Sequence, residues 1–89
     1  MSSAGYLVEC YWPDVSEERL ASAVHLVRKA ASDRRRRGGT VEFLGSILVP
    51  VDETVFCLFE GTENDVRAVS ELAGVPFERV LESLRLEGE

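Results

Sequence analysis

Hydrophobic positions in the first half of this chain alternate first as in a strand and then recur as in a helix. Tyr6 to Tyr11 (YLVECY) has strand character, and Trp12-Pro13-Asp14 ends it because proline cannot donate to a ladder. Ser16 is the predicted N-cap of a helix that Gly38-Gly39 terminates. The apolar face of this helix is predicted to consist of Leu20, Ala23, Val24, Val27, Ala30 and Ala31.

The second half repeats this switch of period. Val41 to Pro50 and Thr54 to Glu60 are β-rich and are separated by a connection of hairpin length, Val51-Asp52-Glu53, which predicts an antiparallel pair. A helix is predicted over Glu63 to Ala73, between Thr62 as N-cap and Gly74 as C-terminal stop. A last strand follows through about Val80 to Leu86.

The predicted order is strand, helix, strand, strand, helix, strand. This split βαβ pattern indicates a ferredoxin-like α+β sandwich, in which an antiparallel four-stranded sheet carries two helices on one face. We expect one domain over residues 1–89, with an ordered core of about 5–87. The first strand should lie in the centre of the sheet, between the third strand and the last.

The strand Thr54 to Gly61 (TVFCLFEG) is apolar on both faces. Val55, Cys57 and Phe59 alternate with Phe56 and Leu58. The first set, together with Val8 and Cys10 of the first strand, is expected to face the helices, and the second set is expected to point away. Because a chain this short covers only one face of its sheet, a partner or ligand must cover the second. We therefore expect a homodimer or higher homo-oligomer formed through the open sheet face.

Composition narrows the classes of partner. The net charge is -6, from 16 acidic and 10 basic residues, which excludes nucleic acid and anionic membranes as main partners. No apolar run has the length of a signal peptide or a bilayer span, so a cytoplasmic protein is expected. The run Arg34 to Arg37 fits either a solvated helix end, which the helix dipole favours, or a site for an anion or an acidic partner.

Polar residues on the open face are candidates for a site. Glu9 and Glu60 share the parity of this face, and two close, half-buried carboxylates would take up a proton, a cation or an arginine such as Arg79. Alternatively, Glu60 is exposed at its strand end and Glu9 pairs with an arginine. The full set of predicted ligand-binding residues is Glu9, Tyr11, Trp12, Phe56, Leu58, Glu60, Arg79 and Glu82.

Three blocks of the sequence, YLVECYWPD, ETVFCLFEG and AGVPFERVLES, carry a family resemblance. The chain resembles a family of small, uncharacterised ferredoxin-like proteins that read YLVER, FCVYEA and GLP-x-(D/E)-R-(I/V) at these places. Nickel binding and dimeric association have been attributed to that family, so the resemblance implies a possible nickel site. The family commonly has histidine and serine in the second strand where this chain has Gly45-Ser46, which removes the obvious metal ligand.

The remaining candidate metal ligands are few. His25, the one histidine, lies within the first predicted helix and is expected at its surface or boundary. Cys10 and Cys57 are far apart in sequence and outside any CxxC spacing, so we expect two buried, reduced thiols. If a metal binds, its ligands would come from Glu9, Glu60, Cys10 and Cys57.

Three functional interpretations follow. The first is a dimeric protein that binds a small ligand or a divalent metal on the open sheet face. The second is a cofactor-independent acid/base enzyme acting on an aromatic or polyketide-like molecule, with Glu9 or Glu60 as the base. The third is a structural or regulatory interaction module. The sequence lacks phosphate-loop, HExxH and GxSxG motifs, so an enzyme is the less favoured class.

Overall fold

The computed structural model describes residues 2–86. The chain runs through β1 (Ser2–Tyr11), α1 (Glu17–Arg36), β2 (Val41–Val49), a 3-10 turn η1 (Pro50–Asp52), β3 (Thr54–Gly61), α2 (Glu63–Ala73) and β4 (Phe77–Leu86). This is the predicted order of strands and helices. The C-terminal limit of the expected ordered core, residue 87, lies outside the described residues.

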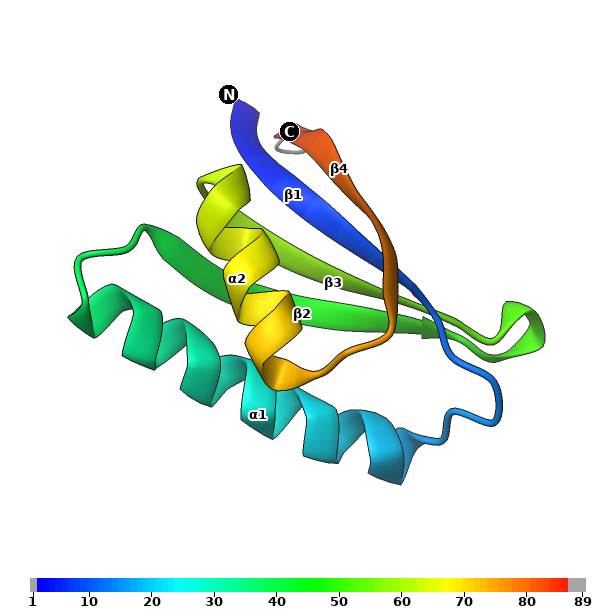
Figure 1. Ribbon diagram of the computed structural model, residues 1–89. Helices are drawn as coiled ribbons and strands as arrows, with labels where there is room; N and C mark the ends of the chain where they lie inside the picture. The colour runs from blue at the N-terminus through cyan, green and yellow to red at the C-terminus, as the bar shows by residue number, and fades with distance from the viewer. Residues whose placement is uncertain (1, 87–89) are drawn as a thin grey trace.

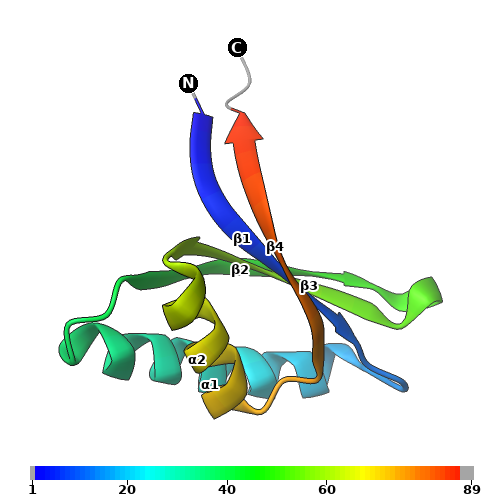
Figure 2. The ribbon, with the colours of Figure 1, turned by 45° about the horizontal axis from the view of Figure 1, so that its top comes forward.

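The four strands form one antiparallel sheet in the order β2-β3-β1-β4. Both helices lie on the same side of this sheet, and the opposite side carries no helix within residues 2–86 (Figures 1 and 2). The prediction of a ferredoxin-like α+β sandwich is therefore confirmed, including the central position of β1. We call the side of the sheet away from the helices the open face.

The hydrophobic core fills the space between the sheet and the two helices. The predicted helix-facing residues of β1 and β3 are all buried, namely Val8, Cys10, Val55, Cys57 and Phe59. The helices contribute the other side of the core through Val27, Ala30 and Ala31 of α1 and Val66 and Val69 of α2. The rings of Phe43 and Phe59 meet edge to face with their centroids 5.4 Å apart, an arrangement that aromatic pairs favour.

Each helix begins at its predicted N-cap and α2 ends at Gly74, whereas α1 ends at Arg36, just before the predicted stop Gly38-Gly39. The Ser16 hydroxyl accepts the N–H of Arg19 at 3.1 Å at the start of α1, and the Thr62 hydroxyl accepts the N–H of Asp65 at 3.3 Å at the start of α2. Gly74 ends α2 with a φ of 74°, a left-handed conformation that glycine adopts without steric cost. The spacing of apolar and capping residues thus determines both helices locally.

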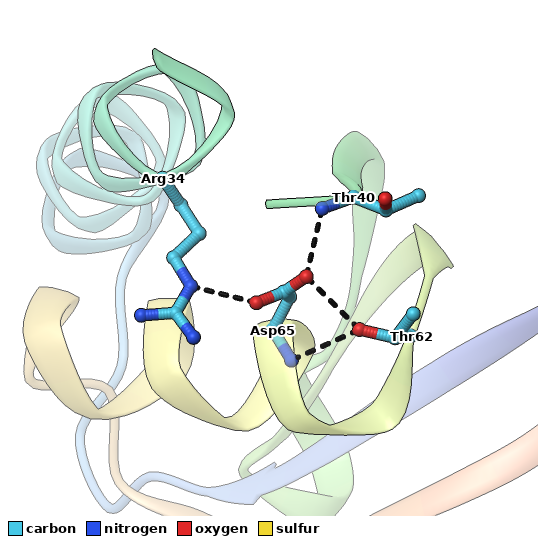
Figure 3. A network of polar contacts seen from close by, with 4 residues as sticks. All are labelled: Arg34, Thr40, Thr62 and Asp65. Carbon is cyan, nitrogen blue, oxygen red and sulfur yellow. Dashed lines mark hydrogen bonds and ion pairs between the residues drawn. The ribbon is translucent and has the colours of Figure 1, made fainter. Parts of the chain in front are cut away.

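The carboxylate of Asp65, in the first turn of α2, contacts the distant connection from α1 to β2 as well as its own helix cap (Figure 3). One oxygen accepts Nε of Arg34 at 2.7 Å, and the other accepts the backbone N–H of Thr40 at 2.7 Å and the Thr62 hydroxyl at 3.0 Å. The Thr40 N–H, the Arg34 guanidinium and the Thr62 hydroxyl hold the pKa of Asp65 below its ordinary value. This network connects the end of α1, the start of β2 and the first turn of α2.

The other arginines of the run Arg34 to Arg37 have different surroundings. Arg35 donates through Nη1 to the backbone oxygen of Val41 at 2.9 Å, while Arg36 forms an exposed ion pair with Asp33 at 3.3 Å. These contacts show that the run is more than a uniformly solvated helix end.

None of the helices within residues 2–86 is long and apolar enough to cross a lipid bilayer.

Strand boundaries differ from the predictions at both ends of the β1 and β4 pair. β1 begins at Ser2 and β4 at Phe77, because Ser2 to Gly5 pair with Leu86 to Ser83 and Cys10 pairs with Phe77. Between Val49 and Thr54 the predicted hairpin connection forms the turn η1, which ends at Glu53 in a left-handed conformation with a φ of 50°. The sequence did not predict these additional strand residues because most of them are small or polar, and a strand is recognised in a sequence by alternating apolar residues.

Candidate functional site

Rows of side chains cross the open face where the strands pair. In the central row, Phe56 of β3 lies opposite Glu9 of β1, and Glu9 lies opposite Arg79 of β4. The next row is apolar and consists of Leu58, Leu7 and Leu81. Phe56, Leu58, Leu7 and Leu81 are all half-buried, although no helix covers them in the described chain. The predicted parity of the first and third strands is confirmed.

Glu9 and Arg79 form an ion pair in the central row. Nε of Arg79 lies 2.6 Å from Oε1 of Glu9, and the glutamate side chain is 25% exposed whereas the arginine side chain is 61% exposed. The hydrogen bond to the carboxylate raises the pKa of Arg79 from its ordinary value. The alternative in which Glu9 pairs with an arginine is therefore correct. The guanidinium is accessible enough for further donors to contact a ligand.

Glu60 lies apart from Glu9. Tyr6 pairs with Phe59, which places Glu60 beside Gly5, four positions along β1 from Glu9. At about 3.4 Å per residue this separation is roughly 14 Å along the strand, so the two carboxylates do not share a proton or a cation. Glu60 is half-buried rather than exposed, and its neighbour across the β2 and β3 pair is Glu42. The hypothesis of a Glu9 and Glu60 pair is wrong.

Two other predicted site residues lie on the helix-facing side of the sheet. Glu82 pairs with Tyr6, whose neighbour Phe59 on β3 is buried in the core, and Glu82 is exposed there. Trp12 packs against the core and lines a hollow of about 320 Å³ between α1 and the end of α2. Neither can border a site on the open face. Tyr11 does lie on the open face, at the end of β1, and is 50% exposed.

The cysteines lie on the opposite side of the sheet from the glutamates that were predicted to bind metal with them. Cys10 is 1% exposed and Cys57 is 3% exposed, and both are free thiols. Contact with Cys57 and burial both raise the pKa of Cys10, so this thiol stays protonated at neutral pH. Because the sheet separates them from Glu9 and Glu60, the four proposed metal ligands cannot meet. Among residues 2–86, no group of three or more histidine, cysteine, aspartate or glutamate side chains could hold a metal ion.

Sequence reasoning missed two apolar members of the open face, Leu81 and Ile47. Leu81 pairs with Leu7, and Ile47, which is 52% exposed, pairs with Phe56. The position of Ile47 depends on a register shift in β2 between Phe43 and Gly45, where Gly45 has a φ of 149°. Such a bulge changes which residues face the open side, and Gly45 within a strand was the only local signal of it.

Comparison with known proteins supports the fold. No family model matches the sequence, and no curated protein was found to match it. The crystal structure of SCO4226 from Streptomyces coelicolor A3(2) superposes with a TM-score of 0.77, at 21% sequence identity, over 94% of this chain and 99% of that chain. At this identity the likeness establishes a common fold and carries no information on function.

Proposed function

We propose that the protein is a homodimer that binds a small organic ligand on the open sheet face. The observation that carries this proposal is the pair Phe56 and Leu58, which are large, apolar and half-buried on the side without a helix. Exposed apolar surface of this kind marks an interface or a ligand site in soluble proteins. Two copies that pack these faces together would remove the apolar rows from water, as in sheet-on-sheet packing.

The central row supplies the polar part of the proposed site. The Glu9 and Arg79 ion pair lies directly beside Phe56, so an aromatic surface and two charged groups are adjacent. Binding sites for small ligands combine apolar walls with a few fixed polar groups in this way. A ligand with an aromatic body and one polar substituent would satisfy both.

An organic ligand is favoured over a metal ion because the described carboxylates and thiols are divided between the two faces of the sheet. The family resemblance nevertheless makes nickel the metal to test. An acid/base reaction with Glu9 as the base is less favoured, because the Arg79 guanidinium already occupies that carboxylate.

The dimer is tested by native mass spectrometry of untagged protein, with Leu58→Asp and Leu72→Asp as matched variants. Leu72 on α2 is 71% exposed and away from the open face, so it controls for the added charge. We expect wild type and Leu72→Asp to be dimers, and Leu58→Asp to weaken association by about 3 kcal/mol or more, since the charge would be buried in an apolar interface. A monomeric wild type, or a Leu58→Asp variant that dimerises as well as wild type, would contradict the proposal.

Ligand binding is tested separately with a panel of aromatic carboxylates, phenols and amides, and with nickel, zinc and a chelator. We expect an organic compound to raise the thermal midpoint of the dimer, and Arg79→Gln to reduce this shift while the dimer persists. Retention of nickel by the purified dimer, lost on chelation, would replace the organic ligand with a metal. If neither organic compounds nor metals bind, the open face is an interaction surface only.

A further inference from the structure

A hollow with a volume of about 400 Å³ lies between the second half of α1 and the first residues of β2. Its lining residues are Arg28, Ala31, Arg35, Glu42 and Phe43. The volume lies within the range that small-molecule sites occupy. Because Ala31 and Phe43 belong to the helix-facing core, this hollow is distinct from the apolar rows of the open face.

Contacts with the start of β2 fix the position of both arginine side chains of the hollow. Cζ of Arg28 lies 5.1 Å from the centroid of the Phe43 ring, and Nη1 of Arg35 lies 2.9 Å from the backbone oxygen of Val41. The two arginines are seven positions apart, about two helical turns, and so extend from the same side of α1. The residues that they contact, Val41 and Phe43, are two strand positions apart in β2, and both guanidinium groups border the same hollow.

Neither guanidinium has a carboxylate partner among the residues that the structure describes. By contrast, four arginines of the described chain form ion pairs with an acidic side chain at 3.3 Å or less, namely Arg34, Arg36, Arg67 and Arg79. Arg35 uses one of its donors for Val41, and Arg28 interacts with the face of an aromatic ring. Most of the five N–H donors of each group are therefore available to a ligand.

We propose that this hollow binds a small organic phosphate through a phosphate group that bridges Arg28 and Arg35. Planar guanidinium groups bind phosphate oxygens in pairs, through hydrogen bonds of about 2.8 Å. Two guanidinium groups that line the same hollow can both donate to the oxygens of one phosphate. Phe43 and Ala31 would contact the organic part of the ligand.

Glu42 is the acidic residue of the lining. It is exposed and forms no ion pair with Arg28 or Arg35 in the described part of the chain. A carboxylate at this rim repels a bound anion, so it lowers affinity and disfavours ligands with several negative charges. Removing the charge of Glu42 should therefore raise the affinity for phosphate only if the phosphate binds in this hollow.

The experiment is a titration of the full chain, first with inorganic phosphate and then with phenyl phosphate. Binding is measured from the amide chemical shifts in NMR spectra, and chloride keeps the ionic strength constant. We expect saturable shifts at Arg28, Arg35 and Phe43, and tighter binding of phenyl phosphate than of inorganic phosphate. Arg28→Gln and Arg35→Gln should each weaken binding roughly tenfold or more, because a charge-assisted hydrogen bond is lost. Glu42→Gln should strengthen it.

Arg36→Gln is the matched control, because it removes the same charge from the same helix at an exposed position outside the hollow. It should change affinity by no more than about twofold, as expected for screened surface charges. Arg28→Lys keeps the charge but loses the planar fork, so it should weaken binding in a protein whose spectrum shows an intact fold.

Three results would overturn the proposal. The first is a linear shift without saturation, which indicates general charge attraction. The second is an equal loss of affinity in Arg36→Gln and Arg35→Gln. The third is binding of succinate or benzoate as tight as that of phenyl phosphate, which would make the site one for carboxylates.

Discussion

Arg34 on α1 and Asp65 on α2 form an ion pair, with Nε of the arginine 2.7 Å from Oδ1 of the aspartate. The residues are 31 positions apart, and the same carboxylate also accepts the backbone N–H of Thr40. A single carboxylate therefore connects the end of α1, the residue before β2 and the first turn of α2 (Figure 3). Its loss should be measurable in the stability of the whole fold.

Asp65→Asn should destabilise the protein at pH 7 by about 1–3 kcal/mol, because the amide replaces an anion that accepts charge-assisted hydrogen bonds. The pKa of Asp65 is lowered in the folded protein, so its contribution is complete above the ordinary aspartate pKa of roughly 4 and is lost as the pH falls through the lower folded value. Urea unfolding at pH 7 and at pH 3 should show a gap between wild type and variant that shrinks at the lower pH.

Asp33→Asn is the control for this experiment. Asp33 forms an exposed ion pair with Arg36 on the same helix, with side-chain exposures of 49% and 77%, so its loss should cost less than about 0.5 kcal/mol. If Asp33→Asn and Asp65→Asn have equal effects, the network around Asp65 makes no special contribution.

Gly61, at the end of β3, has no room for a side chain. Its φ is 133°, and a methyl group there would collide with the backbone oxygen of Thr40 and lie 2.8 Å from Cα of Val41. Gly61→Ala should therefore cost about 3 kcal/mol or more, from backbone strain and overpacking together. Chemical denaturation of the purified variant measures this value.

Gly74→Ala separates the two causes. Gly74 also has a positive φ, 74°, but no atom lies within 4 Å of an added methyl group. We expect it to cost roughly 1–2 kcal/mol, the penalty for a left-handed residue with a side chain. If Gly61→Ala is no more destabilising than Gly74→Ala, the close approach of Thr40 and Val41 is relieved by a small movement.

The two thiols should be inert in the folded protein. Cys10 and Cys57 are almost completely buried, so the reagent cannot reach either sulfur. The contact between the two thiols raises the pKa of Cys10 and lowers the pKa of Cys57, so burial is the reason why Cys57 should not react. Reaction with Ellman's reagent should be slow at pH 8 and should yield two thiols per chain immediately after unfolding in guanidinium chloride. Rapid reaction of the native protein would mean that the core opens readily around β1 and β3.

The hydrophobic pattern was sufficient for the fold and for the faces of β1 and β3. α2 is confirmed from its first residue to its last, because Thr62 and Gly74 cap it locally. The parity of Phe56 and Leu58 follows from strict alternation along an uninterrupted strand. Both are properties of a few neighbouring residues, which a sequence displays directly.

The site was predicted less completely, because its geometry depends on register. Glu82 was a candidate for the open-face site, but its pairing with Tyr6 puts it on the helix-facing side of β4, where it is exposed. The spacing of Thr62 and Asp65 suggests a capping box, whereas nothing local indicates that Arg34 and Thr40 share the same carboxylate.

The pairing of Ser2 with Leu86 makes the first and last strands neighbours in the sheet (Figure 1). β2 and β3, by contrast, are connected by only four residues, Pro50 to Glu53, and can pair as soon as both have left the ribosome. The central strand β1 has its second neighbour only after β4 has been synthesised, and closing so long a loop is entropically costly. Pairing of β1 with β4 therefore requires the longest loop closure in the sheet and should form more slowly than the local pairing of β2 with β3.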